Sequence, residues 1–165
     1  MPVTFFVTGD SIRERIVDDV VTALEGITLA NGYGFEVVKV YREAFAAINF
    51  PAYPVFNVIE VDENDETRLL GGTIGATTGS KWHHTLTLAV GCLIEARDNA
   101  SESVNEMLAA VQRAVMVEPT RGGLAIDTKL AGSQQFVEID TEPVGLLQVK
   151  LDITYRHSYL NPYQL

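Results

Sequence analysis

The sequence predicts an α+β domain in which a mainly antiparallel or mixed β-sheet packs against two helices, with the element order α-β-β-β-α-β-β. Two segments with strict apolar alternation, 82–97 and 145–157, predict long strands with one buried face. Two others, 11–26 and 101–116, have the apolar spacing of amphipathic helices. The chain has 165 residues, of which 47% are hydrophobic, and shows no linker, so residues 1–165 are expected to form one domain.

The first helix is predicted from a start signal and a stripe. Ser11 with Glu14 three residues later has the pattern of a capping box, and the helix is expected to end near Glu25 and Gly26. Its apolar positions recur every four residues: Ile12, Ile16, Val20 and Leu24.

The segment between the first helix and Trp82 is predicted to hold two strands. After the turn signal NGYG, residues 35–43 are rich in Val and aromatic residues and predict a strand. Residues 45–54 carry two prolines and predict a loop. Residues 55–62 predict a second strand that ends in an acidic turn, and the Gly-rich and Thr-rich stretch 63–81 is expected to be a long exposed loop or hairpin arm.

The segment WHHTLTLAVGCLIEAR predicts a strand that is buried on one face. One face is almost entirely apolar, and it carries Trp82, His84, Leu86, Leu88, Val90, Cys92, Ile94 and Ala96. The opposite face is small or polar, so this strand is expected to lie in an antiparallel sheet with one covered face.

The second helix follows as the period changes from two to 3.6. Its cap is expected to be Ser103, paired with Glu106, or alternatively Ser101, and Pro119 with the glycines at 122 and 123 ends it. The apolar stripe contains Val104, Met107, Leu108, Val111 and Val115.

The last third of the chain predicts two further β segments. Residues 120–140 are expected to form a hairpin that turns at Ala131 to Ser133, and residues 145–157 form the closing strand before a short tail at 158–165. The closing strand places its apolar residues on one face: Leu147, Val149, Leu151, Ile153 and Tyr155.

The amino-acid composition restricts the kinds of partner and the compartment that are expected for this protein. The net charge of −10 and the sequence pI near 4.6 argue against a surface that binds nucleic acid, since such binding relies on Lys and Arg. The single cysteine, Cys92, excludes an intrachain disulfide and suggests a reducing compartment. The sequence has no signal peptide pattern and no apolar run of membrane-spanning length, so a soluble protein is expected.

The motifs that usually carry chemistry do not fit. The segment GATTGSK lacks phosphate-loop spacing and precedes a strand. His83 and His84 are neighbours in a strand and so point to opposite faces. The acidic residues from Glu60 to Glu66 lack the order of a calcium loop. We therefore expect no enzyme activity, no catalytic residue, no metal and no cofactor, and we interpret Arg68, Arg121 and Arg156 as surface or interface ion-pair partners.

The pattern of elements resembles the tail terminator, or tail completion, proteins of long-tailed bacteriophages, the group that contains the lambda-type minor tail protein U. The resemblance rests on chain size, on SIRERIVDDVVTALEGI, on WHHTLTLAVGCLIEAR followed by SESVNEMLAAVQRAVM, and on LLQVKLDITYRHSY with its short tail. It covers about residues 11–160 and includes no invariant catalytic motif.

The resemblance implies a structural virion protein of the phage tail or neck, present in the host cytoplasm during assembly. Such a protein forms a homo-oligomeric, typically hexameric ring that caps the tail tube, ends its polymerisation and offers a head–tail joining surface. Its partners are the tube protein and the connector or neck proteins, and DNA passes through the ring without adhering to it. An acidic loop tip would suit such a lumen.

Two groups of residues follow as candidates for these roles. The expected subunit or tube contacts lie in the arm and tail: Arg68, Leu69, Leu70, Ile74, Tyr159, Leu160 and Tyr163. The expected lumen-facing carboxylates are Asp62, Glu63, Asp65 and Glu66.

Two other readings stay open on sequence alone. One is a different phage structural protein, such as a tube protein or a head–tail connector or neck component. The other is a small cytosolic enzyme or ligand-binding domain whose site is assembled from scattered residues, with His84 or the acidic cluster involved.

Overall fold

The computed structural model describes residues 9–44, 52–68, 81–95, 99–139, 143–158 and 161–165, without the side chains of 65–68, 100, 136–139 and 143. The elements, in chain order, are α1 (Ile12–Glu25), the short 3-10 helix η1 (Leu29–Asn31), β1 (Lys39–Tyr41), β2 (Val55–Arg68), β3 (Lys81–Glu95), α2 (Ala100–Met116), β4 (Ala125–Ile139) and β5 (Pro143–Ser158). The predicted α+β class and the order of the main elements are confirmed.

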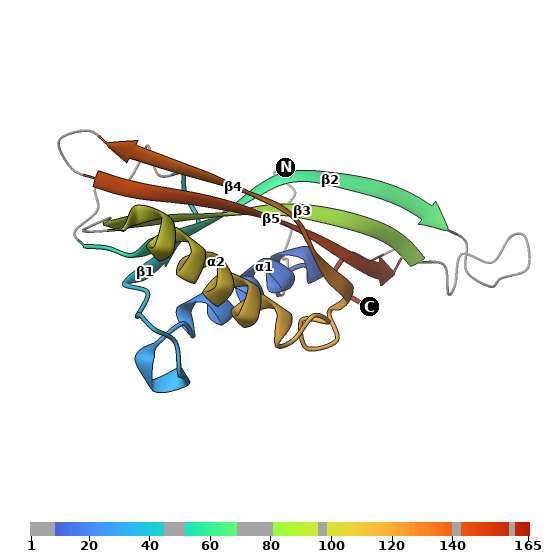
Figure 1. The fold of residues 1–165 in the computed structure, drawn as a ribbon. Helices are drawn as coiled ribbons and strands as arrows, with labels where there is room; N and C mark the ends of the chain where they lie inside the picture. Colours follow the sequence, from blue (N-terminus) through green and yellow to red (C-terminus); the bar gives the residue numbers. More distant parts are fainter. Residues whose placement is uncertain (1–8, 45–51, 69–80, 96–98, 140–142, 159–160) are drawn as a thin grey trace, which may run out of the picture.

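The five strands form one mixed sheet in the order β1-β2-β3-β5-β4. Only β1 and β2 are parallel, and every other neighbouring pair is antiparallel. Both helices lie against the same face of this long, curved sheet (Figure 1). The result is a two-layer molecule whose second sheet face has no helix of the described residues over it.

The core lies between that helical layer and the sheet, and the predicted strand parity is confirmed. Leu86, Leu88, Val90 and Cys92 of β3 are completely buried, as are Leu147, Leu151 and Ile153 of β5. They meet the helical stripes in one cluster, which includes Ile12, Ile16, Val20 and Leu24 of α1 and Val104, Met107, Val111 and Val115 of α2. Each such side chain stabilises the fold by about 1.5–3 kcal/mol through burial alone.

The helix caps confirm one prediction and correct another. The Ser11 side chain accepts a hydrogen bond from the Glu14 N–H at 3.1 Å, as expected for the cap of α1. In α2 the prediction of Ser103 or Ser101 is wrong, because the cap is Asn99. The Asn99 Oδ1 accepts from the Glu102 N–H at 3.3 Å, and its Nδ2 donates to the Glu102 carboxylate at 3.1 Å. Asn is as good a cap as Ser, so the helix begins earlier than the serines suggested.

Strand β2 is longer than predicted and β1 is shorter. The chain does not turn at Asp62: β2 continues to Arg68, which pairs with Lys81. The first part of the predicted 63–81 loop is therefore strand, since the long β3 offers pairing partners along its whole length. A bulge between Glu60 and Asp62 admits Val61 as an extra residue. The predicted strand 35–43 is reduced to Lys39–Tyr41.

The predicted hairpin at residues 120–140 is also wrong. From Ala125 to Ile139 the segment forms one continuous strand, β4, antiparallel to β5. At the predicted turn there is instead a bulge, with Ala131 as the extra residue between Leu130 and Gly132, and Gly132 has φ +138°. A second bulge lies between Ala125 and Asp127.

Candidate interaction surfaces

The sheet has two open margins. No described strand pairs with the outer side of β4, the last strand in the order. At the opposite margin, β1 pairs only with Val55, Phe56 and Asn57, so β2 from Val58 to Arg68 has no described partner on that side. As far as the described residues go, both margins therefore present backbone N–H and C=O groups without a strand partner.

Exposed apolar side chains lie on both margins. Val61 at the β2 bulge is 54% exposed, and on β4 Ile126 and Leu130 are 46% and 38% exposed. Charged residues normally keep an edge strand from pairing, and β2 carries carboxylates on both sides of Val61, whereas β4 has both Ile126 and Leu130 exposed. Apolar contact area is therefore larger at the β4 margin.

Among the acidic residues of β2, Asp62 is exposed, whereas Glu63 has partners on the helical side of the sheet. Asp62 is exposed and its carboxylate accepts from the Glu63 N–H at 2.8 Å. Glu63 points to the helical side, where it accepts from the Tyr155 hydroxyl at 2.5 Å and lies 3.3 Å from the Arg13 Nε. Asp65 and Glu66 are in β2, but their side chains lie outside the described residues.

Two arginines, Arg13 and Arg42, bind carboxylates of β2 and α1. Arg13 pairs with Glu60 at 2.5 Å, while Arg42 bridges Glu60, Glu14 and Asp18 at 2.9–3.2 Å. The pKa of Arg42 is raised, mainly by its hydrogen bond to Glu14. These contacts tie β2 to α1, so Glu60 and Glu63 have structural partners within the subunit.

The predicted arm residues are only partly described. Arg68 closes β2 opposite Lys81, and its side chain is outside the described residues, as are Leu69, Leu70 and Ile74. The structure therefore describes the paired ends of β2 and β3 on either side of residues 69–80, which lie outside the described residues.

The C-terminal tail is anchored to its own subunit. Tyr159 and Leu160 lie outside the described residues, but Tyr163 is described and is 38% exposed. The Pro162 carbonyl accepts from the Ile12 N–H at 3.0 Å, and the Gln164 carbonyl accepts from the Ser158 N–H at 2.7 Å. The tail thus satisfies one of the free donors at the start of α1.

A stack of aromatic rings at the end of β3 and β5 was not predicted. His84 is stacked on Tyr155 and on His157, with ring centroids 4.9 and 4.6 Å apart. The two histidine Nε2 atoms are 2.8 Å apart, and His157 Nδ1 lies 2.8 Å from the Ser158 carbonyl. Because that carbonyl can only accept, this contact requires a proton on His157 Nδ1. Strand register, which sequence does not show, brings the two histidines together.

Arg121 corrects another expectation. It is 1% exposed rather than on the surface. Its Nη1 lies 3.1 Å from the Asp19 carboxylate, and its Nη2 donates to the Val115 carbonyl. Burial lowers the pKa of Arg121, while Asp19 opposes that shift. This arginine joins the two helices.

The chemical groups that often mark active sites are not clustered in the described part of the chain. Among those residues, no three His, Cys, Asp or Glu side chains converge in a way that would hold a metal ion. The Cys92 thiol is buried, and burial raises its pKa well above the usual range. No helix in the described ranges has the length and apolar character that crossing a bilayer requires.

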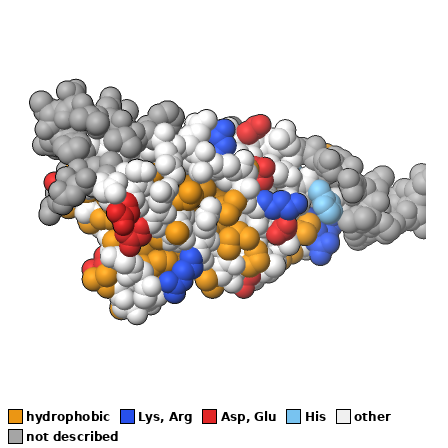
Figure 2. Space-filling model, viewed as in Figure 1, with side chains coloured by type: hydrophobic (Ala, Val, Ile, Leu, Met, Phe, Trp, Pro, Cys, Tyr) orange, Lys and Arg blue, Asp and Glu red, His pale blue; other side chains and the backbone are white. Residues whose placement is uncertain are grey.

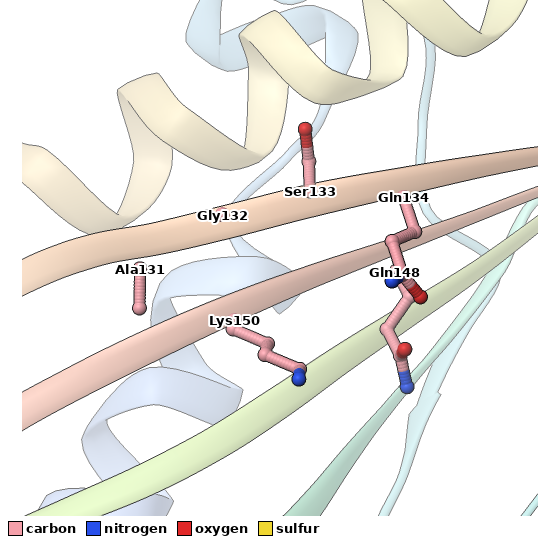
Figure 3. Close-up of a pocket in the computed structure, with 6 residues that line it drawn as sticks. All are labelled: Ala131, Gly132, Ser133, Gln134, Gln148 and Lys150. Atoms are coloured by element: carbon pink, nitrogen blue, oxygen red, sulfur yellow. The ribbon is translucent and has the colours of Figure 1, made fainter.

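The hollows are shallow and lie on the sheet and between the helices. One of about 140 Å³ is at the β4 bulge, where Gln134, Gln148 and Lys150 point to the sheet face away from the helices and Ser133 points the other way (Figure 3). A second of about 310 Å³ on the open sheet face is lined by Ile59, Val61, Ala89 and Leu146, among others. On the helical side, hydrophobic side chains lie among scattered charges of both signs (Figure 2).

Comparison with known proteins gives no further guide to these surfaces, since the chain matches no family model and no curated protein.

Proposed function

We propose that this chain is a structural protein of the phage virion that forms a ring, hexameric by resemblance to the tail terminators, on the end of the tail tube. The ring ends polymerisation of the tube protein and provides the surface that joins the tail to the connector or neck proteins. DNA passes through it as cargo that does not adhere. The protein acts without an enzymatic site or cofactor.

The observation that supports this proposal best is the sheet with two open margins, each bearing exposed apolar residues. A ring built by rotation needs two different, complementary surfaces on each subunit, because its interfaces are heterologous. The two margins differ in sequence and lie at opposite sides of the sheet, as such a ring requires.

The β2–β3 hairpin supports a second contact, with the tube. Its strands pair as far as Arg68 and Lys81, and the segment between them leaves from this paired end. A hairpin arm on a rigid sheet is suited to reaching a neighbouring molecule. We assign residues 69–80, including Leu69, Leu70 and Ile74, to the contact with the tube.

The experiment is a tube-capping assay with a matched arm variant. Residues 69–80 are replaced by Asn-Gly, which suits a two-residue hairpin turn between the paired Arg68 and Lys81. The unaltered protein is expected to fix tube length and to yield capped ends in electron micrographs. The variant is expected to keep its thermal unfolding midpoint but to leave tubes growing.

Two results would contradict the proposal. Long cylinders formed by the purified protein alone would identify a tube protein instead. Tubes whose length is unaffected by the unaltered protein would exclude a terminator role. Normal capping by the arm variant would remove only the assignment of residues 69–80.

A further inference from the structure

We propose that the ring is closed by β-sheet pairing, with the open edge of β4 in one subunit against the open edge of β2, from Val58 to Arg68, in the next. The inference rests on the proposed function and names the surface through which copies of this chain meet. Its partner is a second copy of the same chain.

Strand direction is the first support. Successive neighbours from β2 through β3 and β5 to β4 are all antiparallel, so β4 runs opposite to β2. Rotation about a ring axis places β2 of the next copy beside β4, and the two strands still run in opposite directions. The junction is therefore antiparallel, like the pairs from β2 to β4 within one chain, and the sheet continues from subunit to subunit.

The side chains at the two edges give the second support. Val61 on β2 and Ile126 and Leu130 on β4 are exposed in the single chain and would be covered by such a junction. Lys129 on β4 is also well exposed, with 72% of its side chain accessible, and it lies 3.8 Å from the Asp127 carboxylate of the same strand. Because these two charges of β4 balance, this edge repels the acidic strand β2 less than a second acidic edge would.

Charge also disfavours the twofold alternative at β2. If two copies met through β2, Asp62, Asp65 and Glu66, which are the acidic residues of this edge apart from Glu60 and Glu63 with their arginine partners, would meet an identical set. Like charges opposite each other destabilise a strand pair. The acidic edge therefore fits a different edge, and β4, where Lys129 balances Asp127, lies at the other margin.

The contact is tested by cysteine cross-linking in the full chain. Val61→Cys is combined in turn with a cysteine at one exposed β4 position: Ile126, Lys129, Leu130, Ser133 or Gln135. The native Cys92 is completely buried and is not expected to react. Oxidation is carried out on the purified protein at high concentration and on the protein bound to tail tubes.

At least one double variant is expected to give a ladder of covalent oligomers that ends at the ring, while every single variant stays monomeric. Dimers from a single β4 cysteine would show a twofold β4–β4 contact and overturn the proposal. Bonds from β4 to the tube protein would overturn it too. So would rings seen in electron micrographs with no ladder in any double variant.

A second measurement uses lysine substitutions. It does not depend on which residues of β2 and β4 lie opposite each other. Val61→Lys and Leu130→Lys place a charge in the proposed junction, while Val117→Lys is the control at a residue that is 76% exposed outside both edges. The edge variants are expected to raise the dissociation constant of the contact between subunits on the order of tenfold, equal to about 1.4 kcal/mol, with an unchanged unfolding midpoint. Assembly equal to that of the control would overturn the proposal.

Different results would reject the proposed interface and the proposed function. Ladders without tube capping would reject the terminator role and leave the junction standing. Capping by rings that give no ladder would reject the junction and leave the terminator role standing.

Discussion

Arg121 holds the C-terminal end of α2 against α1. It adopts the left-handed conformation, with φ +52°, and from there its guanidinium reaches both the Asp19 carboxylate and the Val115 carbonyl. Helix ends leave carbonyls without partners, so a buried donor at this place satisfies a group that would otherwise lose a hydrogen bond. A charge at 1% exposure is tolerated because a carboxylate and a carbonyl accept from its two terminal nitrogens, although its Nε has no hydrogen-bond partner.

The contribution of Arg121 is predicted to be large for a single residue. Arg121→Asn keeps a residue that accepts the left-handed conformation but removes the guanidinium. It is expected to lower the free energy of unfolding by about 2–3 kcal/mol, because Asp19 and the Val115 carbonyl lose their partner. Urea denaturation measures this change.

The matched control is Arg156→Asn on β5, an exposed arginine, which is expected to change stability by less than about 0.5 kcal/mol. Equal effects of the two substitutions would contradict the role assigned to Arg121.

At the scale of elements, the approach of α2 to the sheet depends on a glycine. At Gly145 in β5, a Cβ atom would lie 2.9 Å from Val104 Cγ2 and 3.1 Å from Ile94 Cγ2. Val104 is completely buried on α2, so it cannot move aside without disturbing the core. The glycine thus sets how closely the start of α2 packs on the sheet.

Gly145→Ala is predicted to destabilise the protein. Replacing glycine where the backbone is ordinary would otherwise stabilise a fold by about 0.4–1 kcal/mol. Overpacking a core costs about 1–3 kcal/mol, so the contact with Val104 is expected to decide the sign. Thermal unfolding measures the effect of Gly145→Ala twice, once in the unaltered protein and once in the Val104→Ala variant. The loss of stability is expected to be smaller in the Val104→Ala variant. An equal loss in both would show that the contact with Val104 is not its cause.

At the scale of the whole molecule, the helical layer and the two sheet margins make the described part of the chain asymmetric. Both helices cover one face of the sheet, and the two margins are formed by different strands, β2 and β4. The ring that we propose needs such asymmetry, because its subunits would meet through two different surfaces.

The acidic residues of β2 give a prediction at this scale. Asp62, Asp65 and Glu66 are changed together to Lys, and Glu63 is left because it binds Arg13 and Tyr155. If these carboxylates face the lumen, DNA passage and infectivity per capped tail should fall on the order of tenfold, since DNA would adhere to the lysines. The number of capped tails should fall as well, because the same residues lie on the strand edge that we propose to pair with β4.

The control changes three exposed carboxylates outside β2, Glu25, Glu36 and Glu106, to Lys. Its infectivity is expected to be unaffected. Full infectivity per capped tail of the β2 variant would place these residues away from the lumen, and unchanged capping would argue against the proposed junction at β2.

The sequence by itself determined the two helices, the parity of β3 and β5 and hence the face that forms the core. These are local properties, because apolar periodicity and the Ser11 cap act within a few residues. Only the tertiary structure decided where β2 ends, that β4 is one bulged strand, that His84 meets His157, and that Arg121 is buried beside Asp19. Each of these depends on which distant segment lies alongside, and pairing partners and strand register are set by the whole sheet rather than by neighbours in the chain.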